Sequence, residues 1–413
     1  MGRLEPCADD EAAPGLRGNV WLISVTAAVL ITALYTWNRL LPFMLRERGA
    51  DDLQVSLIYT LMNLTVNLFQ YPGGVMADRQ GRKLWVVMPT LGVGMLYLAV
   101  FFTPGWAAFA ALLVAVNCLN AVQAPAFVAL MAESVPAAER GRAFAVLQFF
   151  VGASVAAGPA LGALLLPLVG ADALVVVTGA IFIGCGLVRQ FRLRETLREA
   201  PAPQAADLGR PGFRRLWALL AVSTAFVALQ GLTAWGPFIA LYLADSMGYT
   251  PRQVNLLFAL APLLAVGFSP FGGRITDRLG AGRVLGLACL AHVVTLAGWL
   301  FTRGLGLTAF FLVLVFGSIQ LAGIAFDTLR AEVAGDRERG RVLGVLGTAA
   351  GTAAAMAPVL AGLLSRRFGP LAPFGLAAMA ALSVPGAVRL LRPAAGAGER
   401  AAGREGRAAA GAG

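Results

Sequence analysis

Charged residues are scarce in this sequence. Asp, Glu, Lys and Arg make up 13% of the 413 residues, against about 25% in an average soluble domain. Apolar residues reach 58% and the mean hydropathy is +0.74, whereas soluble domains are about 45–50% apolar. A soluble globular fold is therefore excluded, and we expect a protein that crosses the membrane several times.

Cysteine, histidine and clustered carboxylates are also nearly missing. The four cysteines stand singly at positions 7, 118, 185 and 289, with no CxxC pair, so neither a disulfide framework nor a zinc site is expected. A membrane-embedded enzyme would need carboxylates or metal ligands gathered at one membrane face, and the sequence has no DDxxD run and a single histidine. We expect no metal, no cofactor and no catalytic residue.

Long apolar runs make up most of the chain. They are separated by charged residues or by Gly and Pro, and each reaches the roughly 20 residues that a membrane helix needs. We predict an all-α membrane protein of twelve helices at about 20–45, 53–77, 84–103, 106–134, 142–166, 172–190, 213–244, 252–273, 283–302, 305–331, 341–365 and 370–392.

A polar stretch in the middle of the chain divides these helices into two groups of six. It covers about 191–212 and is the longest polar stretch between the predicted helices. The Ala, Gly and Arg residues after position 393 lack the apolar side chains of a packed core. The predicted regions are a tail (1–19), a six-helix bundle (20–190), a linker (191–212), a second six-helix bundle (213–392) and a disordered tail (393–413).

The distribution of basic residues predicts the orientation. A net charge of +11 would suggest nucleic-acid binding in a soluble protein, but in membrane proteins Lys and Arg gather in cytoplasmic loops. With both termini in the cytoplasm, 26 of the 33 basic residues lie on that side. We therefore expect cytoplasmic termini, a cell membrane location and no nucleic-acid partner. The other side holds Arg39, Arg46, Arg48, Arg252, Arg303, Arg366 and Arg367.

Motifs of the first half recur 199 residues later. The repeated positions run from the second to the fifth predicted helix without an insertion, which indicates duplication of a six-helix unit. Two such units in the same orientation are parallel repeats, and transporters of this kind bind substrate at the repeat interface near mid-membrane. The first four repeated residues are Gly74, Asp78, Arg79 and Gly81, which return as Gly273, Asp277, Arg278 and Gly280.

These motifs resemble those of the major facilitator superfamily. The segment from Gly74 to Lys83 reads GxxxDRxGRK and follows the second predicted helix, which is the place of the family's signature loop. Helix number, repeat and linker agree with the family over about residues 20–392. The resemblance implies a membrane transporter that works by alternating access on a small-molecule substrate, and a monomer.

Charged residues around the signature loop predict a gate. Glycine allows the tight reversal between two helices, and Asp78 stands among basic residues that can form charge-assisted hydrogen bonds with it. The resemblance implies that such networks stabilise the outward-facing state; the alternative is that the charges only set topology. The predicted gate residues are Gly74, Asp78, Arg79, Gly81, Arg82, Lys83, Glu133, Arg140 and Arg142, with Asp277, Arg278, Glu332, Arg339 and Arg341 in the second half.

The fifth predicted helix carries Gly152, Gly158, Pro159 and Gly162. Gly158 and Gly162 form a GxxxG pair that lets two helices approach closely, and Pro159 removes a backbone hydrogen bond. This pattern resembles a glycine-proline motif that the family associates with exporters.

Polar side chains within the predicted helices mark a candidate substrate cavity. Burying an unsatisfied amide costs about 1–3 kcal/mol, so these amides either line a cavity or join helices to one another. Arg39 either reaches the membrane interface or contacts an anion in the cavity. The candidates are Asn38, Arg39, Asn63, Asn67, Gln70, Asn117, Asn120, Gln123, Gln148, Gln230, Trp235 and Gln320.

We predict a secondary transporter that exports small amphipathic compounds. Proton antiport is implied by the resemblance alone, because no Asp or Glu lies deep in the helices expected to line the cavity. The alternatives are uptake or facilitated diffusion of a neutral polar solute such as a sugar and, more distantly, a membrane receptor or membrane enzyme.

Overall fold

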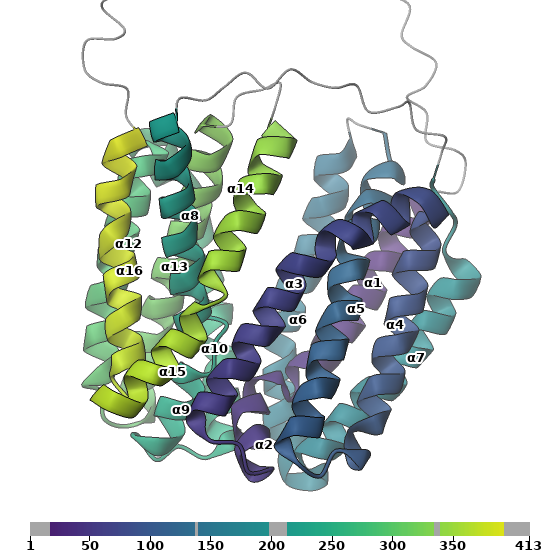
Figure 1. The fold of residues 1–413 in the computed structure, drawn as a ribbon, viewed down its shortest axis with the longest axis horizontal. Helices are drawn as coiled ribbons and strands as arrows, with labels where there is room; N and C mark the ends of the chain where they lie inside the picture. The colour runs from purple at the N-terminus through teal and green to yellow at the C-terminus, as the bar shows by residue number, and fades with distance from the viewer. Residues whose placement is uncertain (1–16, 137–138, 198–212, 334–338, 392–413) are drawn as a thin grey trace, which may run out of the picture.

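The chain folds into two helical bundles that stand side by side (Figure 1). The computed structural model describes residues 17–136, 139–197, 213–333 and 339–391, and the regular structure within these ranges is entirely helical. Residues 1–16, 198–212 and 392–413, which hold most of both predicted tails and of the predicted linker, lie outside the described residues. The predicted all-α membrane fold is confirmed.

The first bundle is formed by the helices that precede the linker. They are α1 (Arg17–Tyr35), η1 (Asn38–Leu40), α2 (Leu41–Glu47), α3 (Asp52–Gln80), α4 (Arg82–Leu98), η2 (Ala99–Phe102), α5 (Trp106–Glu133), α6 (Arg140–Val169) and α7 (Ala171–Arg192). We call this bundle the first half.

The second bundle, which we call the second half, follows the linker. Its helices are α8 (Phe213–Thr233), α9 (Phe238–Asp245), α10 (Pro251–Ala265), η4 (Val266–Phe268), α11 (Ser269–Leu279), α12 (Ala281–Leu300), α13 (Leu305–Val333), α14 (Arg339–Ala354), α15 (Ala357–Phe368) and α16 (Ala372–Leu391).

Each of the twelve predicted helices coincides with one helix or with a consecutive run of helices, but four are interrupted. The first, seventh, eighth and eleventh predicted helices were expected to be continuous, and this was wrong. Pro42, Pro270 and Pro358 stand in the first turn after three of the breaks, and Pro237 caps α9 after the fourth. Proline lacks a backbone N–H, so it is well placed where a new helix begins and poorly placed inside one.

Within the described ranges, eleven segments have the length and hydropathy of membrane spans. The second predicted helix, α3, is 29 residues long and lies within the first half (Figure 1), but it is not among these eleven. Asn63, Asn67 and Gln70 lie on α3 and lower its hydropathy. These amides explain why α3 falls below the hydropathy of the eleven segments.

Each half has its own hydrophobic core. The buried apolar cluster of the second half runs from Ala218 to Leu391, and the two clusters of the first half draw on residues between Val20 and Leu193. No buried member of these clusters is shared between the halves among the described residues. Since close packing between helices stabilises a membrane bundle, the halves are built as two bodies.

The two halves meet at one end of the molecule. We call this the far end; it contains α2, α9 and the last turns of α15 (Figure 1). The opposite end holds the turn at Gly81 and the ends of α7 and α16, and we call it the signature end. Helix α10 packs on α6 and α15 packs on α3, while α2 touches α9. These contacts join the halves.

The halves separate toward the signature end. On α3, the four successive residues 68–71 are all exposed, and Tyr71 is 80% exposed. Successive residues are 100° apart on a helix, so four exposed residues in a row cover most of its circumference. This part of α3 can therefore pack against neighbouring helices on one narrow side only. In Figure 1, α3 and α14 move apart toward the signature end.

The internal repeat extends to backbone conformation. Gly81 and Gly280 both end a helix with positive φ, at 108° and 83°. Asp51 and Thr250 each form a capping box with the glutamine three residues later. Both pairs keep the offset of 199, so the same local structure is built twice.

Two glycines of the predicted glycine-proline motif allow α6 to pack closely on α1. A Cβ atom added at Gly158 would lie 2.5 Å from the Cβ of Tyr35, and one at Gly162 would lie 2.0 Å from the carbonyl oxygen of Thr36. Gly152 has open space around it. Gly158 and Gly162 therefore allow the close contact between α6 and the last turn of α1.

We expect Gly162→Ala to destabilise the protein by about 1–3 kcal/mol, the usual cost of overpacking. Gly152→Ala is the matched control, since the same change on the same helix meets no atom within 4 Å. Thermal and denaturant unfolding of the detergent-purified protein would measure both. Equal stability of the two variants would contradict the packing described here.

Candidate functional site

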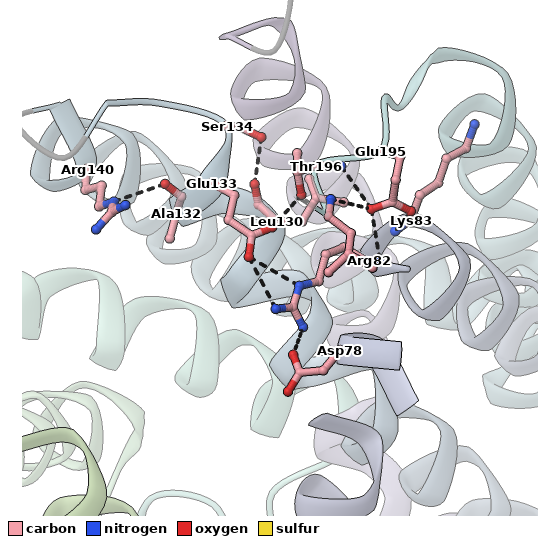
Figure 2. A network of polar contacts seen from close by, with 11 residues as sticks. Asp78, Arg82, Lys83, Leu130, Ala132, Glu133, Ser134, Arg140, Glu195 and Thr196 are labelled. Atoms are coloured by element: carbon pink, nitrogen blue, oxygen red, sulfur yellow. Dashed lines mark hydrogen bonds and ion pairs between the residues drawn. The ribbon is translucent and has the colours of Figure 1, made fainter. Parts of the chain in front are cut away.

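The signature loop carries a charged network within the first half (Figure 2). The guanidinium group of Arg82 pairs with the carboxylate of Asp78 and also donates from Nε to Oε1 of Glu133 at 3.3 Å. Arg82 opens α4, Asp78 lies near the end of α3, and Glu133 ends α5. One arginine thus joins three helix ends.

Glu195 extends this network into the segment after α7. Its carboxylate accepts hydrogen bonds from the backbone N–H groups of Arg82 and Lys83, at 2.9 and 3.0 Å, and from those of Thr196 and Leu197. It therefore caps the N-terminus of α4, where an anion is favoured by the free N–H groups and the helix dipole. Burial alone would raise the pKa of the Glu195 carboxyl, but the four N–H donors hold its pKa below the usual value.

The residues next to Glu195 are held as well. Thr196 donates from its hydroxyl to Oε2 of Glu133 at 2.7 Å. The side-chain amide of Asn19 on α1 bonds to both the N–H and the carbonyl group of Arg194 at 3.1 Å. Sequence analysis missed Asn19, Glu195 and Thr196, because nothing in the chain's local pattern shows that a segment after α7 returns to the start of α4.

The other predicted gate residues of the first half take smaller parts. Gly81 adopts the positive φ that the turn requires, and a Cβ atom added at Gly74 would lie 3.6 Å from the Cβ of Pro125. Arg140 donates to the carbonyl oxygen of Ala132 and not to Glu133. Arg79 and Arg142 are exposed.

The second copy of the network is not formed among the described residues. Asp277, Arg278 and Glu332 are exposed, and no ion pair is described for them. The side chains of Arg339 and Arg341 lie outside the described residues. Where Arg82 stands in the first copy, the second has Ala281, so the central cation of the network is missing from the repeat.

An ion pair joins the halves at the far end. Arg46 pairs with Asp52 of its own half at 2.6 Å and with Asp245 of the other half at 2.8 Å. Arg46 and Asp245 are separated by 199 residues, so they occupy equivalent positions of the repeat. A pseudo-twofold axis relates the two repeats, and two equivalent positions can touch only where they lie close to that axis. This pair therefore lies at the centre of the far end.

Arg39 lies at the break between α1 and α2 and is buried between the halves. It is 7% exposed, and its Nη1 donates to the carbonyl oxygen of Ala234 in the second half at 2.7 Å. Its guanidinium lies over the rings of Tyr35, Trp235 and Phe258, at 5.5, 5.4 and 4.6 Å from their centroids. Of the two readings of Arg39, exposure at the membrane interface is wrong.

Two further hydrogen bonds link the halves through backbone groups. Asn255 on α10 donates from Nδ2 to the carbonyl oxygen of Thr36 at 3.0 Å. The backbone N–H of Val359 on α15 donates to the hydroxyl of Thr60 on α3 at 3.0 Å. Each uses a group near a helix break or helix start, where backbone donors and acceptors are left free.

The predicted cavity amides fall into separate groups. Asn67 faces the second half, since a Cβ added at Gly351 would lie 2.2 Å from its Oδ1. Gln123 instead bonds to Val86 and Thr90 of α4, inside the first half, and Gln320 bonds to Ser269 within the second. Asn117 is bonded within its own helix. The remaining candidates differ in exposure. Half-buried side chains are those of Asn38, Asn63, Asn120 and Gln230, and exposed ones are those of Gln70, Gln148 and Trp235. That any of the candidate residues contacts a substrate stays a prediction.

Two parallel six-helix bundles that meet at one end define the architecture of a secondary transporter. A family model described as Major Facilitator Superfamily matches residues 22–329 and 224–411. The chain belongs to this superfamily, whose members are transporters and not enzymes, and the predicted resemblance is confirmed.

Similar proteins include transporters of different stated substrates. The chain is 24% identical to a probable sulfoacetate transporter, SauU, of Cupriavidus necator, over 79% of this chain and 82% of that protein. It is 26% identical to the multi-drug resistance efflux pump PmrA of Streptococcus pneumoniae, over 62% of this chain and 66% of that one.

A solved structure shares the fold. It is that of a bacterial homolog of the human lysosomal transporter Spinster in an inward-facing and unoccupied conformation, with a TM-score of 0.72 and 16% sequence identity over 92% of this chain and 95% of that chain.

We expect Glu195→Ala to lower stability at pH 7 by about 0.5–2 kcal/mol, the range for losing a helix cap. The folded-state pKa lies below the ordinary value of about 4.3, so the cap's stabilisation is present above that value and is lost as the pH falls through the folded-state pKa. Thermal unfolding as a function of pH would measure the difference from wild type. Glu47→Ala, at an exposed far-end carboxylate, is the control; a difference that persists at the lowest pH would contradict the assignment.

Proposed function

We propose that the protein exports small amphipathic compounds across the cell membrane by alternating access, with the substrate entering between the halves at the signature end. The observation that carries this proposal is the arrangement of the halves. Each has its own core, and they meet at the far end. Such bodies can rock about a shared contact without disrupting either core.

The charge distribution supports a cytoplasmic signature end. Among the described residues, most Lys and Arg lie on helix ends and turns at the signature end, and the positive-inside rule assigns such an end to the cytoplasm. Two of the far-end arginines are neutralised, Arg46 by Asp52 and Asp245 and Arg48 by Asp172. With this orientation, the opening at the signature end faces the cytoplasm, where an exporter takes up its substrate.

The ion pair at the far end is weak enough to break in each cycle. The Arg46 and Asp245 side chains are 27% and 48% exposed, and exposed pairs contribute about 0.2–1 kcal/mol. Closure of the signature end would bring α3 and α14 together beside Asp78, whose side chain is 63% exposed. On the family resemblance, the network around Arg82 then stabilises the closed arrangement.

The relatives support transport and leave the direction to experiment. The Streptococcus pneumoniae protein is named as an efflux pump and the Cupriavidus necator protein as a probable sulfoacetate transporter. Uptake of a neutral polar solute is the second candidate, and the half-buried amides of Asn63 and Asn120, for which no side-chain hydrogen bond is described, favour it. We take the proton as the coupling ion and a monomer as the working unit on the family resemblance.

The test is accumulation of a chemically diverse compound panel in a host that lacks its major efflux pumps. We expect wild type to lower the accumulation of some compounds, Asp78→Asn to lose most of this effect, and a protonophore to abolish it. Asp277→Asn is the matched control, because Asp277 is the repeat equivalent of Asp78 and is exposed; its effect should be much smaller. Raised accumulation in wild type would contradict export and favour uptake.

A further inference from the structure

Arg39 is a buried cation without a counter-ion. It is 7% exposed, and among the described residues no carboxylate pairs with it; its one hydrogen bond goes to the neutral carbonyl group of Ala234. Its Nε–H is buried and has no hydrogen-bond partner. Burying a charge is costly unless it is paired, and here only a carbonyl group and three aromatic rings offset that cost.

The fold does not need a cation at this position. Counting back from Gly49 and Gly248, the equivalent glycines with positive φ, the repeat partner of Arg39 is Phe238. Phe238 is 6% exposed and belongs to the apolar core of the second half. An apolar side chain therefore fills the equivalent position in the second half. Because packing does not require a charge there, the charge of Arg39 needs another explanation.

The surroundings of Arg39 fit an amphipathic anion. The guanidinium carries N–H groups in a planar fork that matches the oxygens of a carboxylate, sulfonate or phosphate. Tyr35, Trp235 and Phe258 surround it, and Trp235 is 53% exposed, which leaves ring surface available to an apolar body.

We propose that Arg39 binds the anionic head of an organic oxyanion, while the aromatic rings around it hold the substrate's apolar body. This inference deepens the proposed function and rests on it: it selects anions from among small amphipathic compounds. A charged acceptor makes a stronger hydrogen bond than a neutral carbonyl group. The bound anion thus replaces Ala234 as the partner of Arg39 and removes one of the contacts that hold the far end closed.

Binding to the purified full-length protein tests the assignment without depending on the direction of transport. The probes share one ring system: naphthalene-1-sulfonate, neutral 1-naphthalenemethanol and cationic 1-naphthylmethylammonium. We expect calorimetry to show tightest binding for the sulfonate, and Arg39→Gln to weaken it by about 10- to 100-fold, the scale of a hydrogen bond to a charged group. Binding of the neutral probe should change little.

Three further variants separate binding from folding. Arg39→Lys keeps the charge without the fork and should fall between wild type and Arg39→Gln. Trp235→Ala, at a half-exposed ring, should weaken all three probes. Arg252→Gln removes an exposed far-end charge and should leave sulfonate binding unchanged. Thermal unfolding of each variant verifies that it is folded.

The outcomes distinguish this inference from the proposed function. The anion site is overturned if the sulfonate binds no more tightly than the neutral probe. It is also overturned if sulfonate binding survives Arg39→Gln in a folded protein. Both conclusions hold even if the accumulation assay shows export. Arg39-dependent sulfonate binding supports the anion site even if that assay shows uptake, and only the direction of transport is then wrong.

Discussion

The contact between the halves at the far end is the interaction on which the rest of the structure depends. It is made where α1, α8 and α14 are interrupted, so that carbonyl and N–H groups freed by the breaks reach across the interface. Thr36 and Ala234 accept side-chain hydrogen bonds there, and the backbone of Val359 donates one. Together with the packing of α10 on α6 and of α15 on α3, these bonds and one half-exposed ion pair join two bodies that each bury a core of their own.

The signature network has a different mechanical character. Arg82 connects α3, α4 and α5, and Glu195 adds the segment after α7 by capping α4. All of these partners belong to the first half, so the network makes that half rigid and orders the beginning of the linker beside it. The second half has Ala281 in place of Arg82, and no equivalent network is described there.

Sequence predicted the helices well, because apolar length is a local property that a lipid bilayer imposes directly. The repeat and the Gly81 turn could also be read from the chain. The tertiary partner of a polar side chain could not: Gln123 was assigned to the cavity but bonds to α4, and Glu195 sits in a polar segment with no distinguishing pattern. The burial of Arg39 depends on the break between α1 and α2. The sequence does not predict this break, because the apolar run continues through it.

Distances between spin labels at repeat-equivalent positions test the central claim that the halves rock about the far end. Met76 and Ile275 near the signature end, and Leu57 and Leu256 near the far end, are each between 38% and 42% exposed. Labels would be placed on these pairs in a chain without its native cysteines, in lipid nanodiscs, with and without a transported compound. The account predicts a second population in which the signature-end distance is shorter and the far-end distance is longer. A far-end distance that stays fixed while the signature-end distance changes would contradict it.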